Sequence, residues 1–325
     1  MGQRENNPID GGDDKAIGEA NNSKANKQAL YEANNKNEDN QLCGIWGRQL
    51  RQLDQEQMGF KFMVHVGDIK YGETPCYESS FSDVADMFSH ESNAIHYDLR
   101  DSFFVPGDNE FQDCQDVDQA WKWWMKYFGN GVVPNTNGFS TLSDPNITVE
   151  YQNSTLLRPY NGGNFAFYTD GVLFVGVNQV GGGIVGDEAS RVDGNYKWVK
   201  YNMDTHLSRG MRAIVVFAHA SMGSARQTYF GAPFMSLLKT NAYSRIKALY
   251  IHGDGHTFSN YSPDGTNSNL TSVQVDAGQF ANPIIISVLH DAVADDFSFD
   301  IDRRGGLYSG DCPAGNIDKT WSSDY

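Results

Sequence analysis

Four short segments of the sequence place side chains that can bind metal ions directly after apolar, strand-like runs. Each segment combines Asp, Glu, Asn or His with a small or turn-forming neighbour. The four segments are Gly67-Asp68, Pro106-Gly107-Asp108-Asn109-Glu110, Ala218-His219 and His252-Gly253-Asp254-Gly255-His256. Carboxylate oxygens and imidazole nitrogens together suit Mn, Fe or Zn. Because loops that follow parallel strands meet at the carboxyl edge of an α/β sheet, these groups are expected to converge on one metal site.

The four segments differ in how strongly they indicate chemistry. A single Gly-Asp pair, taken alone, is more typical of a plain turn. A His that follows an apolar strand, as His219 does, is often a core residue whose hydrogen bonds are satisfied. The fourth segment is the least turn-like, because it holds two His and one Asp within five residues. Its two glycines permit the backbone conformations that aim several side chains at one point.

The elements that carry these segments alternate between strand-like and helix-like patterns. Strands are predicted at the apolar runs 60–66, 102–105, 213–217 and 248–251. Helices are predicted at residues 42–58, 81–89, 118–128 and 196–207. Asp118 is the predicted N-cap of the third helix, and its stripe of Trp121, Trp124 and Phe128 is interpreted as core. Asp170-Gly171 predicts a β-hairpin. This mixture predicts a layered α/β or α+β enzyme core.

Length, charge and hydropathy exclude several classes of protein. The chain has 325 residues and 25 basic against 41 acidic residues, a formal charge of −16. Such an acidic chain is not expected to bind nucleic acid. Its longest purely apolar run, residues 171–177, is too short to span a bilayer. Residues 1–40 are polar and are predicted to form a disordered or poorly ordered tail, with one catalytic domain over residues 41–325.

Cysteines and glycosylation sequons indicate a compartment. The four cysteines, Cys43, Cys76, Cys114 and Cys312, fit two disulfides or four thiols, and three pairings are open. Five N-x-[ST] sequons lie at Asn21, Asn146, Asn153, Asn260 and Asn269. They favour a glycoprotein of the secretory pathway. The N-terminus lacks the charged-then-apolar pattern of a signal peptide.

In their order and spacing, the four segments resemble the calcineurin-like metallophosphoesterases of the purple-acid-phosphatase-like superfamily. The resemblance covers roughly residues 42–300 and four of that family's five motif blocks. It implies a four-layer αββα sandwich of two mixed β-sheets flanked by helices. It also implies a phosphatase with two metal ions (Mn, Fe or Zn), which activate hydroxide for in-line attack on the phosphorus of a small-molecule or protein phosphoester.

The resemblance assigns metal-binding roles residue by residue. Asp68 matches the aspartate that bridges the two metals, and His219 and His256 match the ligands of the fourth and fifth motifs. Asp254 stands where the fifth motif has its first His. In the third motif an ungapped alignment makes Asp108 the ligand, whereas a shift of one residue makes Asn109 the ligand. The implied metal ligands are Asp68, Asp108, Asn109, His219, Asp254 and His256.

Two parts of the family's site have no direct counterpart in this sequence: the catalytic acid and the motif that supplies the first metal. The third motif lacks its His, and Asn109 or His252 is the predicted substitute. The first motif should lie on a strand before the helix at 42–58, but residues 1–40 contain no apolar run that could form one. Two alternatives to the phosphatase therefore stay open. They are a degenerate metallophosphoesterase fold that serves in binding or scaffolding, and a phosphodiesterase on the same fold.

A disulfide is predicted beside this site. Cys76 follows Asp68 by eight residues, and Cys114 follows Asp108 by six. If the two preceding strands are neighbours, both cysteines lie on loops at the same face of the molecule. We therefore predict a Cys76–Cys114 disulfide, whereas Cys43 and Cys312 are either free or paired.

Overall fold

The computed structural model describes nine stretches of the chain. These are residues 61–72, 74–89, 102–129, 146–152, 162–182, 188–223, 226–265, 269–276 and 283–304. The tail predicted at 1–40, the helix predicted at 42–58, Cys43 and Cys312 lie outside the described residues. The single domain predicted for residues 41–325 therefore stays a prediction.

The described elements are eleven strands, four α-helices and one π-helix. The strands are β1 (Met63–His65), β2 (Ser102–Phe104), β3 (Glu150–Tyr151), β4 (Phe165–Thr169), β5 (Val172–Gly176), β6 (Ala213–Phe217), β7 (Lys247–His252), β8 (Ser259–Tyr261), β9 (Leu270–Gln274), β10 (Ile285–Asp291) and β11 (Asp296–Asp302). The helices are α4 (Glu78–Ser89), α5 (Val117–Tyr127), α6 (Glu188–Leu207), η4 (Gln227–Gly231) and α7 (Ala232–Leu238).

A mixed sheet of seven strands forms the centre of the fold, in the order β3-β4-β5-β6-β7-β9-β8. The inner strands β5, β6, β7 and β9 pair in parallel, and the outer pairs are antiparallel. Every residue of β5 and β6 is buried. Burial on both faces explains why these strands are continuous apolar runs rather than alternating ones.

Two smaller pairs of strands face this sheet. β1 and β2 pair in parallel with Val64 opposite Phe103, and β10 and β11 form an antiparallel hairpin. Both pairs contribute to one hydrophobic cluster with the large sheet, in which Phe103 stacks on Phe165 at a centroid distance of 4.6 Å. The small strands therefore form a second β-layer.

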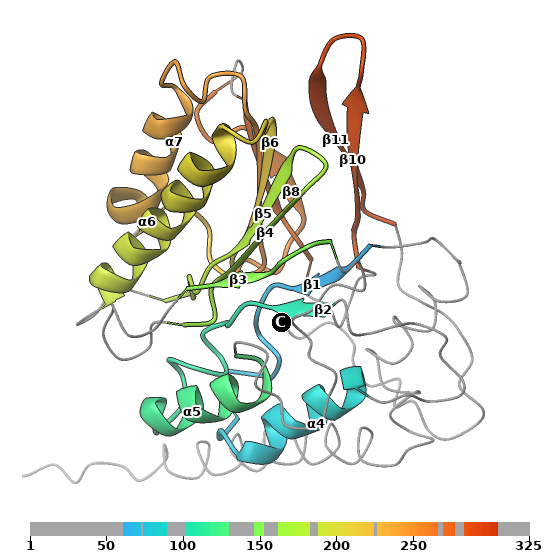
Figure 1. The fold of residues 1–325 in the computed structure, drawn as a ribbon. Coiled ribbons are helices and arrows are strands. Elements are labelled where there is room, and N and C mark those ends of the chain that lie inside the picture. Colours follow the sequence, from blue (N-terminus) through green and yellow to red (C-terminus); the bar gives the residue numbers. More distant parts are fainter. Residues whose placement is uncertain are drawn as a thin grey trace, which may run out of the picture.

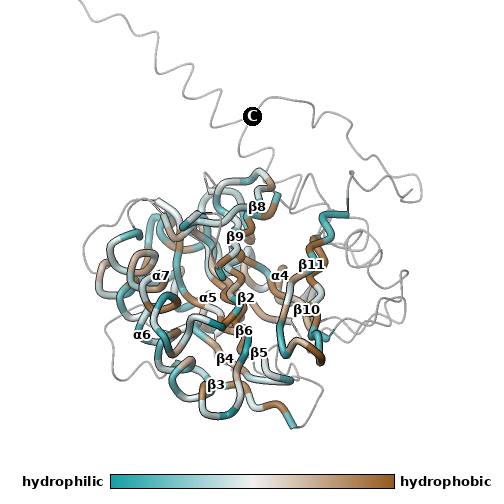
Figure 2. The backbone as a smooth tube through the Cα atoms, turned by 90° about the horizontal axis from the view of Figure 1, so that it is seen from above, coloured by the Kyte–Doolittle hydropathy of each residue, from teal (hydrophilic) through white to brown (hydrophobic). Residues whose placement is uncertain are grey.

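Side-chain alternation separates three hydrophobic cores and so defines four layers. Phe103 lies in the core between the β-layers, whereas its neighbour Phe104 lies with Trp124 in a second core against α4 and α5. A third core lies between the large sheet and the helices α6 and α7, and it contains Val216. Figure 1 shows α4 and α5 at one end of the stack and α6 and α7 at the other. In Figure 2 the interior strands are mostly hydrophobic and much of α6 is hydrophilic. The predicted mixed α/β fold with an αββα arrangement is confirmed.

Several predicted element boundaries need correction. Asp118 is not the N-cap of α5, because the Asp116 side chain accepts the N–H of Gln119 at 2.9 Å and the helix begins at Val117. The helix predicted at 196–207 begins at Glu188. The sequence patterns do not predict η4, which ends at Gly231, or α7, which has Pro233 in its first turn. They also do not predict the short strands β3 and β8. The hairpin at Asp170-Gly171 and the strand at 213–217 are confirmed.

Within the described part of the chain, no helix combines the length and the apolar character that a bilayer crossing requires.

Candidate metal centre

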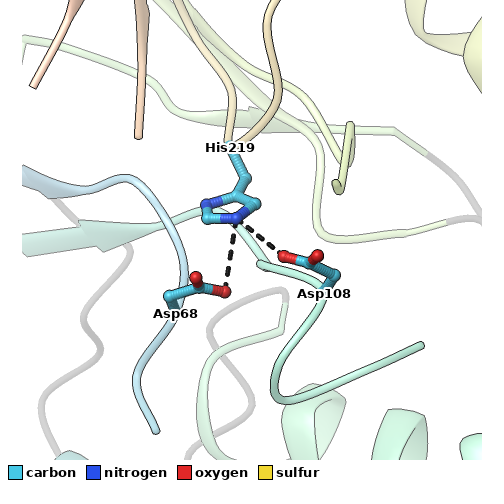
Figure 3. Close-up of side chains that lie close together, drawn as sticks. All are labelled: Asp68, Asp108 and His219. Carbon is cyan, nitrogen blue, oxygen red and sulfur yellow. Dashed lines mark hydrogen bonds and ion pairs between the residues drawn. The ribbon is translucent and has the colours of Figure 1, made fainter. Parts of the chain in front are cut away.

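Three of the predicted metal ligands meet where the loops after β1, β2 and β6 come together. Asp68, Asp108 and His219 each offer one donor atom, and these atoms all lie within 4.8 Å of one another. Figure 3 shows both carboxylates turned toward the same side of the His219 ring. Asp68 and Asp108 are 40 positions apart and are brought together by the parallel pairing of β1 with β2. His219, 111 positions after Asp108, reaches them from β6 of the facing seven-stranded sheet.

The imidazole of His219 presents one nitrogen to the carboxylates. Its Nδ1 lies 2.8 Å from the carbonyl oxygen of Val66, and a carbonyl can only accept, so Nδ1 carries the hydrogen. Its Nε2 then lies 2.8 Å from Asp108 Oδ1 and 3.2 Å from Asp68 Oδ1. A histidine that donates one ring N–H to a backbone carbonyl and aims the other nitrogen at a site is typical of a metal ligand.

The cluster contains more negatively charged groups than positively charged ones. Burial alone lowers the pKa of His219, which is 1% exposed, but the hydrogen bond to Asp108 and the charges of Asp68 and Glu110 raise that pKa to about 9. Burial also raises the pKa of Asp254, and the neighbouring charge of Asp108 raises it further. Crowded carboxylates of this kind are stabilised by a bound cation.

Asp68 is held in a left-handed backbone conformation, with φ 60°. A non-glycine residue in this region costs free energy and is found most often at functional sites. The preceding Gly67 has φ 92°, and a Cβ at that position would lie 2.6 Å from His219 Nδ1. Only glycine therefore lets β1 end this close to the histidine, and the turn directs the Asp68 carboxylate at the cluster.

The segment after β7 brings two more predicted ligands to the edge of the cluster. Asp254 Oδ1 lies 3.9 Å from His219 Nε2, and His256 Nε2 lies 3.6 Å from Asp68 Oδ2. His256 is also left-handed, with φ 58°. The neighbouring Asp68 carboxylate raises the pKa of His256. The two oxygens of Asp68 thus face different histidines.

The two predicted catalytic residues occupy different surroundings. The Asn109 side chain donates to the carbonyl of Lys70 at 3.0 Å, and its backbone N–H donates to Asp68 Oδ1 at 3.3 Å. His252 is the last residue of β7, is 1% exposed and lies 5.8 Å from the ring of Tyr250. Neither ring nitrogen of His252 has a hydrogen-bond partner among the described residues, and burial lowers its pKa to about 4. The catalytic role of both residues stays a prediction.

Sequence reasoning missed the structural role of Glu110. This side chain is fully buried and accepts the N–H groups of Gly107 at 2.6 Å and of Asp68 and Ile69 at 3.2 Å. Burial and the charge of Asp68 raise the pKa of Glu110 to about 7. Glu110 therefore joins the loop after β2 to the loop after β1. The only sequence signal was its place at the end of the third motif.

The same two loops are linked covalently by the predicted Cys76–Cys114 disulfide, with a Cα–Cα distance of 5.5 Å and a sequence separation of 38 residues. Both Sγ atoms lie 3.8 Å from the carbonyl oxygen of Asn109. The disulfide therefore lies next to Asn109 of the third motif and limits the separation of the two loops.

We expect the double variant Cys76→Ser, Cys114→Ser to lose about 3–4 kcal/mol of unfolding free energy, as closure of a loop of this length implies. Urea unfolding with and without reductant measures the loss. In reductant, the unfolding free energy of the wild type should fall to that of the variant, whereas the unfolding free energy of the variant should not change. A non-reducing peptide map that finds Cys76 alkylated as a free thiol would contradict the disulfide.

Comparison with known proteins gives only distant similarities. No family model matches the sequence, and no curated protein matches it. Among solved structures, the chain is similar to the GAP50 anchor of the inner membrane complex of Plasmodium, at 14% identity and a TM-score of 0.42 over 73% of this chain and 67% of that chain. It is also similar to the 5'-nucleotidase of Candida albicans, at 12% identity and a TM-score of 0.36 over 79% of this chain and 45% of the nucleotidase chain. Less than half of the nucleotidase is therefore spanned.

Proposed function

We propose that this protein is a metal-dependent phosphoester hydrolase of the metallophosphoesterase type. The observation that carries the proposal is the cluster of Asp68, Asp108 and His219 at the carboxyl edge of two facing β-layers. Three of the four segments with the family's motif order supply this cluster. The fourth segment supplies Asp254 and His256 at its edge.

The donor set fits a divalent ion of the first transition row. Two carboxylates and one imidazole nitrogen suit Mn, Fe or Zn. Because Nδ1 donates to Val66, Nε2 is the ring nitrogen that an ion would bind, and the ion would displace the proton that Nε2 shares with Asp108. When bound, such an ion polarises a phosphoryl oxygen and lowers the pKa of a coordinated water toward neutrality.

The remaining roles, holding the ions and orienting the phosphate, would belong to side chains of this protein. Asp68 Oδ1 faces His219 and its Oδ2 faces His256, an arrangement suited to a carboxylate shared by two ions. In this proposal His219, Asp108 and Asp254 hold one ion, and His256 belongs to the other. Asn109, whose backbone is fixed on Asp68, would orient a phosphate oxygen.

The proposal extends to substrate and compartment. The net charge of −16 disfavours a nucleic-acid substrate, so we propose a small-molecule or protein phosphoester. A disulfide beside the site fits an oxidising compartment, and the sequons at Asn146 and Asn260 fit a glycoprotein of the secretory pathway.

Metal removal tests the proposed function. We expect purified protein to contain close to two transition-metal ions per chain by elemental analysis and to hydrolyse p-nitrophenyl phosphate. Dialysis against a chelator should abolish turnover, and added Mn²⁺ should restore it, because in this proposal the bound ions would activate the attacking water and neutralise the developing charge.

Other outcomes have distinct meanings. Faster turnover of bis(p-nitrophenyl) phosphate than of the monoester would replace the phosphatase by a phosphodiesterase. Folded protein that binds no metal and turns over neither ester would replace the enzyme by a binding or scaffolding protein.

A further inference from the structure

The backbone of Gly181 lies between two carboxylates of the metal cluster. A Cβ built on Gly181 would lie 2.7 Å from Asp254 Oδ1 and closer still to Asp108 Oδ2. Real Cβ atoms do not approach other atoms this closely, so any side chain at this position would displace one carboxylate or both. Gly181 is buried and belongs to the segment 177–182 that follows β5. None of the four motif segments includes it.

The first half of this segment is fixed by buried hydrogen bonds. The Asn178 side chain accepts from Arg191 at 2.6 Å, and the Asn178 carbonyl accepts from Asn195 at 2.6 Å. The Gln179 side chain donates to the Tyr250 hydroxyl at 2.6 Å. All of these residues are buried. Buried hydrogen bonds of this kind favour one backbone conformation of the segment.

The second half of the segment is held by Arg226, which comes from the distant connection between β6 and α7. Its guanidinium donates to the carbonyl of Gly182 at 2.8 Å and to the carbonyl of Gly181. Arg226 is only 4% exposed. A buried guanidinium offers a rigid fork of donors, so it fixes both peptide groups at once. Its positive charge also acts on Asp254, whose pKa it lowers against the larger effect of burial.

We propose that Arg226 is a positioning residue that holds the backbone of Gly181 between Asp108 and Asp254 and thereby sets the separation of these two carboxylates for cation binding. The inference rests on the proposed metal centre and adds a determinant of its affinity. Arg226 is not one of the proposed metal ligands. It acts by binding the carbonyl groups of Gly181 and Gly182. Gly181 contributes because it has no side chain to displace the two carboxylates.

The test compares Mn²⁺ affinity in four full-length variants, measured by titration calorimetry after the metal has been removed. Gly181→Ala should weaken Mn²⁺ binding at least tenfold, since supporting residues outside the ligand set typically contribute 10- to 100-fold. Arg226→Gln should weaken it similarly. Arg226→Lys should recover part of the affinity, because an ammonium can donate to both carbonyls without the fixed fork. Arg212→Gln is the matched control, since Arg212 pairs with Asp295 at the surface, and it should bind as the wild type does.

A separate readout distinguishes positioning from general destabilisation. Thermal unfolding should show that Gly181→Ala and Arg226→Lys are folded at the assay temperature. Their Mn²⁺ electron paramagnetic resonance spectra should differ from the wild-type spectrum, because the donor geometry changes. A purely structural role would lower the melting temperature without changing the affinity of folded protein.

The possible results separate this inference from the proposed function. If folded Arg226→Gln or folded Gly181→Ala binds Mn²⁺ within twofold of the wild type, the positioning role is overturned and the phosphatase is untouched. If the wild type binds Mn²⁺ but hydrolyses no phosphoester, the proposed reaction fails, while the variant affinities still decide the inference. If the wild type binds no Mn²⁺, both fail together.

Discussion

Asp68→Asn is expected to reduce kcat/KM for p-nitrophenyl phosphate by about 10³-fold or more, which corresponds to about 4 kcal/mol of lost transition-state stabilisation. The substitution removes one negative charge and one donor oxygen from the carboxylate that faces both His219 and His256. It should also lower the metal content below that of the wild type, because the proposed shared ligand is gone.

Asparagine is the appropriate replacement because of the backbone. Asp68 has φ 60°, a conformation that asparagine tolerates better than alanine does. Asp68→Ala would add backbone strain to the loss of the ligand, whereas Asp68→Asn isolates the ligand. Thermal unfolding should therefore show a small change for Asp68→Asn.

A matched control for Asp68→Asn lies on α6. Asp193→Asn removes a surface carboxylate that pairs with Lys197 at 2.6 Å, one helical turn away. Its kcat/KM should equal that of the wild type, because exposed pairs of this kind contribute little. Turnover by Asp68→Asn at more than a tenth of the wild-type rate, with normal metal content, would refute the assigned role of Asp68.

Local sequence patterns located three residues that the fold brings together, Asp68, Asp108 and His219, whose metal-binding role stays a prediction. The run at 213–217 is apolar because β6 is buried on both faces, so its end, and hence His219, could be located locally. Asp68 could be located at the end of the apolar run 60–66, although only Met63–His65 of that run forms β1 and these residues are partly buried. Parallel pairing brings the ends of β1 and β2 together, and the packing of this pair against the seven-stranded sheet adds the end of β6.

The sequence could not predict the parts of the site that depend on distant contacts. Arg226 meets Gly181 across 45 residues, and nothing in the composition near either residue indicates the pairing. Glu110 was recognisable as part of a motif, but its three backbone partners depend on how two loops approach each other. The N-cap of α5 was assigned to Asp118 rather than Asp116, because both are acids before the same apolar stripe and only the backbone angles separate them.

Glu110→Ala is expected to lower the free energy of unfolding by about 3 kcal/mol or more. The substitution leaves the N–H groups of Gly107, Asp68 and Ile69 without the carboxylate that accepts them, and each unpaired buried donor costs about 1–3 kcal/mol. Urea unfolding should show a lower midpoint with an unchanged slope.

Two further variants make the Glu110 result specific. In Glu110→Gln the amide oxygen can still accept from Gly107 and Asp68, but the NH₂ group then faces the N–H of Ile69, so an intermediate loss is expected. Glu78→Ala on α4 is the matched control. Its exposed carboxylate pairs with Lys126 at the surface, and its loss should be much smaller.

The Glu110→Ala substitution is expected to affect the metal centre as well as the free energy of unfolding. The N–H bonds to Glu110 are what hold Asp68 and Ile69 in place directly after Gly67, so without them Asp68 is free to leave its left-handed conformation. Folded Glu110→Ala should therefore also bind Mn²⁺ more weakly, although Glu110 is not a proposed ligand. If Glu110→Ala unfolds at the wild-type urea concentration, the three hydrogen bonds do not hold the two loops together, and another contact must keep Asp68 in place.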